Sequence, residues 1–146
     1  MPFELTTPGA ILFARVFGVF TAPELNHLAT EAEIAETSHP VSLDRITDLT
    51  AVERFEVGIR EIYHFALRRS AQRFSRVVKS AIVVQAPAQF RIAGIYEALN
   101  ENPQIEVRVL QSVTEAKEWF ADPNGASNAP RNPSPERPDG PDGASR

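Results

Sequence analysis

The sequence predicts an α/β fold in which a mostly parallel sheet of four or five strands is covered by about four helices. Two observations lead to this prediction. Segments rich in β-branched and aromatic residues alternate with segments whose apolar residues recur every three or four positions. Three capping-box patterns, a Thr or Ser followed three residues later by Glu, stand at expected helix starts. Repeated strand–helix units imply parallel strands with right-handed crossovers.

The chain is expected to begin with a strand pair. Ile11–Phe20 is rich in Phe, Val, Ile and Leu, which favour a strand. Pro8 and Gly9 form a turn signal, so Phe3–Thr6 is predicted to be an antiparallel partner strand. A capping box at Thr21–Glu24 then predicts a helix, which His39–Pro40 closes.

A second strand–helix unit and a third strand follow. Val41–Leu49 is predicted to be a strand, and Thr50 and Glu53 form a second capping box. This box predicts a long helix that continues to about Ser75. Ser80–Val84 contains an apolar run without alternation, which is typical of a strand buried on both faces.

The final units complete the alternation. Pro87 suits the first turn of a helix that ends near Asn100. Ile105–Leu110 alternates apolar and polar residues, which indicates a strand near a sheet edge. The third capping box, Ser112–Glu115, opens a last helix. Its large apolar residues are Trp119 and Phe120, and we expect Trp119 to pack against the sheet.

The chain divides into one folded domain and a tail. Residues 122–146 are rich in proline and contain no large apolar residue, so they cannot bury enough surface to offset the entropy of ordering. We therefore predict a domain at residues 1–121 and a disordered tail at residues 122–146. The longest apolar run is shorter than the ~20 residues of a membrane span, and the first residues lack the basic region of a signal peptide. The expected location is the cytoplasm.

Sequence patterns of known catalytic and cofactor sites are missing. The chain has no cysteine, no glycine-rich nucleotide fingerprint and no nucleophile elbow. His27, His39 and His64 lie on separate expected elements at no metal-ligand spacing. The sequence therefore predicts a non-enzymatic protein without a cofactor or metal.

One segment is basic in an otherwise acidic chain. Residues 60–79 contain six basic residues and one acidic residue, whereas the whole chain has a net charge of −4. These residues could contact phosphates, but Arg69, Arg73 and Arg76 are spaced as one solvated helix face. The absence of a recognition motif argues against nucleic-acid binding, and an acidic protein partner is a third interpretation.

Several loose motifs occur in a characteristic order: Asp48–Val52, Ala81–Val84, Ile95–Leu99, Val107–Leu110 and Glu115–Phe120. Their order and spacing resemble a STAS-like domain, the fold of bacterial anti-anti-sigma factors and of the cytoplasmic domains of sulfate transporters. More closely, the chain resembles the uncharacterised bacterial branch similar to the sporulation anti-anti-sigma factor. Anti-anti-sigma factors carry an Asp-Ser-Ser/Ala-Gly phosphorylation motif here. The corresponding Glu53–Gly58 matches only at Gly58 and has no serine.

The resemblance implies a regulatory or scaffolding module that docks a protein partner. The candidate surface is the expected loop after the second strand, because partners gather at the carboxyl ends of strands in open α/β sheets. Its candidate residues are Asp48, Thr50, Glu53 and Arg54. Asp48 and Thr50 could instead only cap the following helix. The alternative function is a carrier of a small apolar molecule or lipid in a cavity between helices and sheet.

Overall fold

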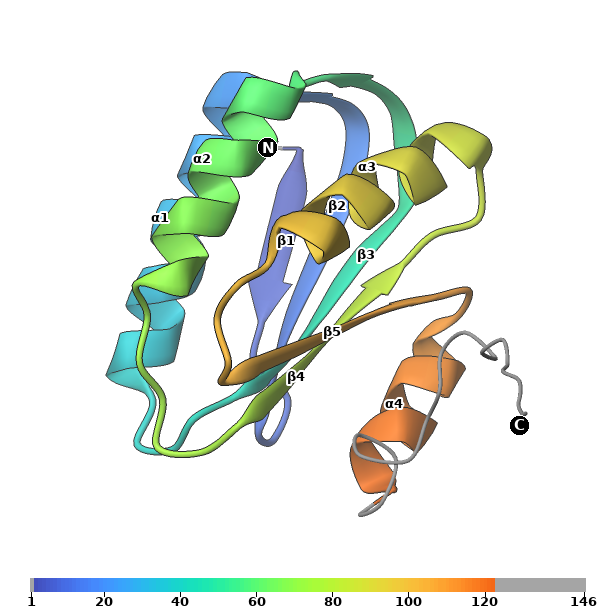
Figure 1. Ribbon diagram of the computed structural model, residues 1–146. Coiled ribbons are helices and arrows are strands. Elements are labelled where there is room, and N and C mark those ends of the chain that lie inside the picture. The colour runs from blue at the N-terminus through green and yellow to red at the C-terminus, as the bar shows by residue number, and fades with distance from the viewer. Residues whose placement is uncertain (1, 123–146) are drawn as a thin grey trace, which may run out of the picture.

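A computed structural model describes residues 2–122 of the protein. The predicted tail at residues 122–146 lies outside this range except for its first residue. In the described residues, nine elements alternate as follows: β1 (Phe3–Thr6), β2 (Ile11–Thr21), α1 (Ala22–Ser38), β3 (Asp44–Glu56), α2 (Ile59–Ser70), β4 (Val78–Val83), α3 (Pro87–Leu99), β5 (Ile105–Leu110) and α4 (Val113–Ala121) (Figure 1).

The five strands form one sheet in the order β1-β2-β3-β4-β5. β1 is antiparallel to β2, and the other neighbours are parallel. The predicted fold class is confirmed, including the N-terminal antiparallel strand. The parallel strands are joined by helices, as parallel crossovers require.

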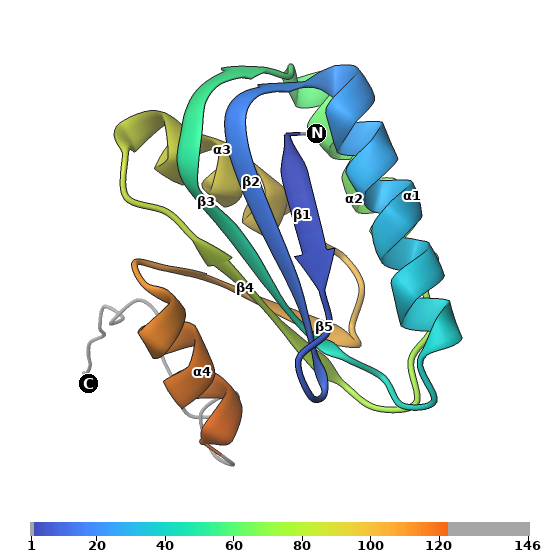
Figure 2. The same ribbon diagram turned by 180° about the vertical axis from the view of Figure 1, so that it is seen from behind.

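Helices cover both faces of the sheet unequally. Apolar residues of α1, α2 and α3, including Leu28, Ile62 and Ala93, share one large core with the inner face of the sheet. α4 packs on the opposite face, where Ala116 and Trp119 meet residues of β3 and β4 (Figures 1 and 2). The protein therefore has a three-helix layer, a sheet and a single helix behind it.

Two of the three predicted capping boxes form helix caps. The Thr21 hydroxyl accepts a hydrogen bond from the Glu24 amide at 3.4 Å, and the Ser112 hydroxyl accepts one from the Glu115 amide at 3.1 Å. These contacts satisfy amides that have no partner in the first helical turn. The starts of α1 and α4 were predictable for this reason.

The second predicted capping box is wrong. β3 continues through Thr50 to Glu56, and α2 begins only at Ile59 and ends at Ser70. The long β2 supplies a hydrogen-bonding partner for this extension as far as the Thr21–Glu56 pair, and Val52 is buried there. Pairing and burial thus keep the segment extended. The cap of α2 lies at Gly58, whose amide donates to the Glu61 carboxylate at 2.8 Å.

β2 and β3 continue together past β4, and α3 is tied to this extension. β3 pairs with β4 only through Asp48, after which β2 and β3 curve away as a two-stranded ribbon (Figures 1 and 2). The buried Gln89 side chain donates to the Val52 carbonyl at 3.0 Å. Its oxygen accepts from the amides of Gln85 and Ala86 at 2.8 and 3.0 Å. Gln89 therefore joins the start of α3 to the ribbon.

Candidate functional site

All four residues predicted to form the docking site lie on β3, not on a loop. The Asp48 carboxylate accepts hydrogen bonds from the Thr50 amide at 3.0 Å and from the Thr50 hydroxyl at 2.7 Å. Glu53 and Arg54 are exposed on the ribbon, and Arg54 forms an ion pair with Glu56 at 2.7 Å. The structure thus separates a self-contained Asp48–Thr50 pair from the accessible charges of Glu53 and Arg54.

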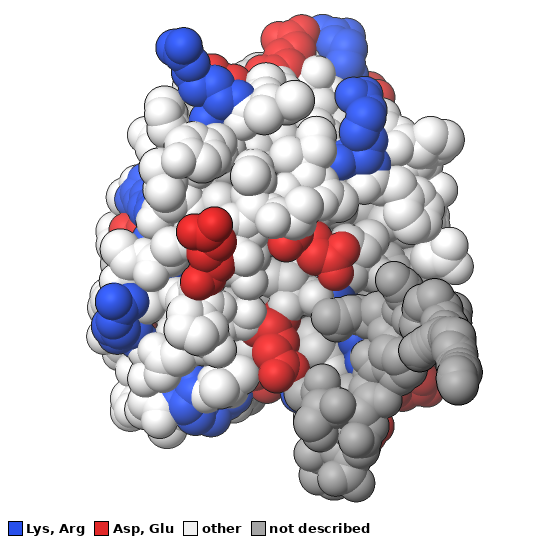
Figure 3. Space-filling view, in the orientation of Figure 1, with Lys and Arg blue, Asp and Glu red and all other residues white. Residues whose placement is uncertain are grey.

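The basic segment does not form the single solvated helix face that its spacing suggested. Arg69 is 2% exposed, whereas Arg73 and Arg76 follow the end of α2. Arg76 forms an ion pair with Asp44 at 3.0 Å, and the Lys79 ammonium donates to the Trp119 carbonyl at the end of α4 at 2.8 Å. Much of the positive charge is therefore neutralised within the domain. Figure 3 accordingly shows cations dispersed among acidic residues, without a continuous basic patch on the described residues in that view.

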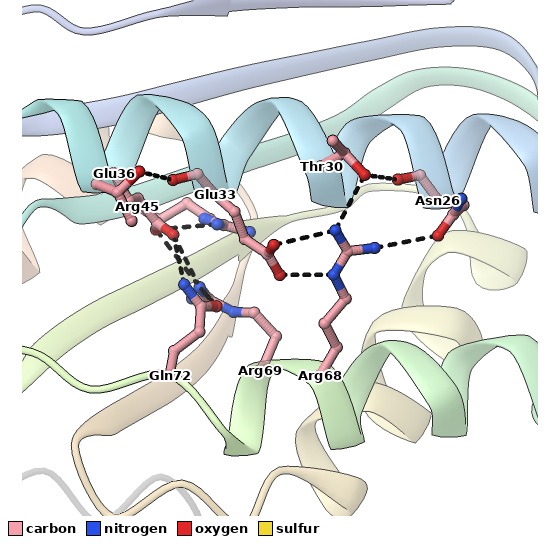
Figure 4. Close-up of polar contacts among 9 residues, drawn as sticks. Asn26, Thr30, Glu33, Glu36, Arg45, Arg68, Arg69 and Gln72 are labelled. Atoms are coloured by element: carbon pink, nitrogen blue, oxygen red, sulfur yellow. Dashed lines mark hydrogen bonds and ion pairs between the residues drawn. The ribbon is translucent and has the colours of Figure 1, made fainter.

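A row of polar side chains, which we call the seam, lies between α1 and α2 (Figure 4). Its members are Asn26, Thr30, Glu33, Glu36, Arg45, Arg68, Arg69 and Gln72. At its outer end, the Arg68 guanidinium donates to both oxygens of Glu33 at 2.6 and 3.0 Å. It also donates to Thr30 and Asn26. The hydrogen bond to Glu33 raises the pKa of Arg68. This half-exposed cluster holds the two helices together side by side.

The inner end of the seam is a buried charge cluster of Glu36, Arg45 and Arg69. These side chains come from α1, β3 and α2, and are 5%, 7% and 3% exposed. Arg45 Nη2 donates to Glu36 Oε2 at 2.9 Å, and Arg69 Nη1 lies 3.3 Å from Glu36 Oε1. Gln72 Nε2 donates to the same carboxylate at 3.0 Å (Figure 4). One carboxylate thus serves two arginines, so the ionised cluster carries one net positive charge.

Burial and charge act against each other in this cluster. Burial raises the pKa of Glu36, but the attraction of Arg45 and Arg69 and the hydrogen bonds from Gln72 and Arg45 outweigh it, so the pKa is below its ordinary value. Burial, and then repulsion by Arg69, lowers the pKa of Arg45 despite the attraction of Glu36. Glu36 is therefore held as a carboxylate by its two cations.

A cavity of about 80 Å³ lies between the three-helix layer and the sheet. This is several times the ~10–15 Å³ that one water molecule needs. Its walls are mostly apolar: Phe20, Leu25, Leu28, Leu49, Phe55, Val57, Ile62, Phe65, Ile82, Ile92 and Ala93. The polar lining residues are Arg45, Thr47, Ser80 and Tyr96. The cavity therefore combines an extended apolar wall with a small polar region next to the charge cluster.

Two polar atoms in this lining are buried without a hydrogen-bond partner among the described residues, Arg45 Nε and the Tyr96 hydroxyl. Both residues are strongly buried: counted over the whole residue, Arg45 is 5% exposed and Tyr96 is 7% exposed. An unpaired buried donor costs about 1–3 kcal/mol, so such groups usually have a purpose or a partner. Neither residue was among the candidate site residues predicted from the sequence. The position of Arg45 could have been found from the alternation Leu43, Arg45, Thr47, Leu49, which places Arg45 on the same face as Leu43 and Leu49.

Comparison with solved structures identifies the architecture. The protein is similar to an uncharacterised protein of the DUF3478 family with a SpoIIAA-like fold from Shewanella loihica PV-4. The TM-score is 0.56 at 13% sequence identity, over 82% of this chain and 92% of the other. The fold is SpoIIAA-like. This confirms the STAS-like resemblance at the level of the fold.

No family model and no curated protein matches the sequence. Within residues 2–122, no helix is long and apolar enough to cross a membrane. The same residues contain no group of three or more His, Cys, Asp or Glu side chains placed to hold a metal ion.

Proposed function

We propose that this protein is a non-enzymatic binding module that takes up a small apolar molecule in the cavity of its SpoIIAA-like fold. The observation that supports the proposal is the cavity itself, which is bounded by α1, α2, α3 and the sheet and has mostly apolar walls. Pockets for small ligands usually have this character, an apolar lining with a few polar groups that set orientation. The proposal corresponds to the carrier alternative raised by the sequence.

Filling the cavity should abolish uptake. Ala93 lies on the cavity wall in α3 and is 1% exposed, so Ala93→Leu would place additional carbon atoms in that space. We expect 1-octanol to raise the thermal midpoint of the wild-type protein, because a ligand that binds only the folded state stabilises it. The shift should disappear in Ala93→Leu.

A matched variant on the same helix controls for the substitution. Ala98 is exposed on α3, so Ala98→Leu adds the same atoms outside the cavity and should keep the octanol response. Calorimetric titration at constant temperature would check both results. The proposal fails if octanol does not bind the wild-type protein, or if folded Ala93→Leu binds it equally well.

A protein-docking role is a second candidate, which the exposed charges of Glu53 and Arg54 favour. Phe55 and Val57, close by in the chain, line the cavity. A molecule bound there would contact the same ribbon that carries these charges. In this arrangement the cavity ligand regulates the docking surface, which joins the two functions in one module.

The docking surface can be tested by reversing its charges. We expect Glu53→Lys combined with Arg54→Glu to abolish capture of a protein partner from the native host, because surface charge governs partner choice more than stability. Both side chains are exposed, so the free energy of unfolding should change by less than about 0.5 kcal/mol per substitution. Retention of every wild-type partner by the double variant would show that docking occurs elsewhere.

A further inference from the structure

We infer that the cavity selects apolar molecules that end in an anionic group, such as a carboxylate, and that Arg45 and Tyr96 bind that group. The inference rests on the proposed function and adds the chemical class of the ligand. It depends on three properties of the described residues: the net charge of the buried cluster, the orphaned donors in the cavity lining and the composition of the remaining walls.

The charge of the buried cluster favours an anion. Glu36 is shared by Arg45 and Arg69, at 2.9 and 3.3 Å, which leaves one positive charge without a matching carboxylate. The neighbouring pairs Arg68–Glu33 and Arg76–Asp44 are each neutral. Buried charges are costly unless they are paired. An anion at the cavity's polar region would supply the second negative charge.

The orphaned groups have the right hydrogen-bonding character. A guanidinium N–H can only donate, and a phenol can donate to an anion. Arg45 Nε and the Tyr96 hydroxyl both belong to residues that line the cavity. Hydrogen bonds from such donors to an ionised acceptor are about twice as strong as those between neutral groups. The two groups are therefore suited to hold one end of a ligand.

The remaining lining residues determine the chemical character of the other end of the ligand. Among the described residues that line it, Arg45 is the only charged one and none is acidic. Phe20 and Phe55 are apolar lining residues farther along β2 and β3, and Val57, also in the lining, directly follows the end of β3. An amphiphile would thus place its charged end at Arg45 and Tyr96 and its apolar chain against these walls.

A series of eight-carbon probes tests the inference. Titration calorimetry at neutral pH would compare octanoate, 1-octanol and octylammonium, which share one chain and differ in charge. We expect octanoate to bind wild-type protein about tenfold or more tightly than 1-octanol, the equivalent of one charge-assisted hydrogen bond. Octylammonium should bind more weakly than 1-octanol, because its charge repels Arg45.

Two variants assign the preference to the named residues. Tyr96→Phe removes only the unpaired hydroxyl and should lower octanoate affinity several-fold while leaving 1-octanol affinity unchanged. Arg45→Met should abolish the preference, and it leaves Glu36 paired with Arg69. Tyr63→Phe, at an exposed position outside the cavity, should behave as wild type. Tyr96→Phe should also keep or raise the thermal midpoint without ligand, because an orphaned buried hydroxyl is lost.

The outcomes separate this inference from the proposed function. Equal binding of octanoate and 1-octanol would overturn the anionic preference but keep the cavity as a ligand site; water or a shifted side chain would then satisfy the two donors. Tight octanoate binding that survives both Tyr96→Phe and Arg45→Met would place the carboxylate elsewhere and also overturn the inference. Failure of every probe to bind would contradict both proposals.

Discussion

Replacing Glu36 with Gln is expected to destabilise the protein by about 3–5 kcal/mol, because removing one partner of a buried ion pair leaves an uncompensated charge. In Glu36→Gln, the guanidinium groups of Arg45 and Arg69 would both lose their carboxylate partner and would be buried next to each other. Urea denaturation at pH 7 measures the change in the free energy of unfolding. The variant's far-UV circular dichroism establishes that it is still folded in the absence of urea.

Glu33 provides the matched control. It is on the same helix and also forms an ion pair with an arginine, but its side chain is 31% exposed. Glu33→Gln should therefore cost less than about 1 kcal/mol, as exposed ion pairs usually do. Equal losses for the two variants would show that the burial of the Glu36 cluster has no energetic consequence.

The contribution of the Glu36 charge should also appear in the pH dependence of the free energy of unfolding. The pKa of Glu36 is below its ordinary value of 4.5 in the folded protein, so its charge stabilises the fold above that value. This contribution should be lost as the pH falls below 4.5 and through the lower pKa of the folded state. In Glu36→Gln this part of the acid destabilisation should be missing. An unchanged slope below pH 4.5 would contradict the assignment.

Trp119→Ala should also cost about 3–5 kcal/mol, the usual penalty for removing a large buried aromatic side chain. Trp119 is 5% exposed and packs with Ile46, Ala81 and Val83 on the sheet face that α4 covers. The Arg108 guanidinium lies 4.8 Å from its ring centroid, which adds a cation–π contact. The placement of Trp119 against the sheet, predicted from the sequence, is confirmed.

The neighbouring Phe120 tests whether the loss of stability in Trp119→Ala is due to the burial of the Trp119 side chain. It is only partly buried, so Phe120→Ala should cost clearly less than Trp119→Ala. Chemical denaturation of both variants, followed by circular dichroism, gives the comparison without relying on tryptophan fluorescence. A loss below about 1 kcal/mol for Trp119→Ala would mean that α4 is not anchored by this side chain.

Patterns local in sequence predicted most of the fold. The alternation of strand and helix segments gave the parallel sheet, and the turn at Pro8–Gly9 gave the antiparallel β1. The caps at Thr21 and Ser112 were predictable because they depend on contacts three residues apart. The box at Thr50 failed because a distant strand decided the outcome. Pairing with β2 kept Thr50–Glu56 extended, and the Thr50 hydroxyl bonded Asp48 instead.

The candidate site depended on tertiary structure almost entirely. The spacing of charges predicted a solvated position for Arg69 and did not single out Arg45 or Tyr96. The reason is that a charge pattern along one helix does not show what packs against that helix. Glu36, Arg45 and Arg69 meet only when α1, β3 and α2 come together. The sequence alone determined the alternation of strands and helices, the caps at Thr21 and Ser112 and the absence of known catalytic motifs, since these are encoded by neighbouring residues. The tertiary structure decided the extent of β3, the buried charge cluster and the cavity, since each arises where segments distant in the chain bury their side chains together.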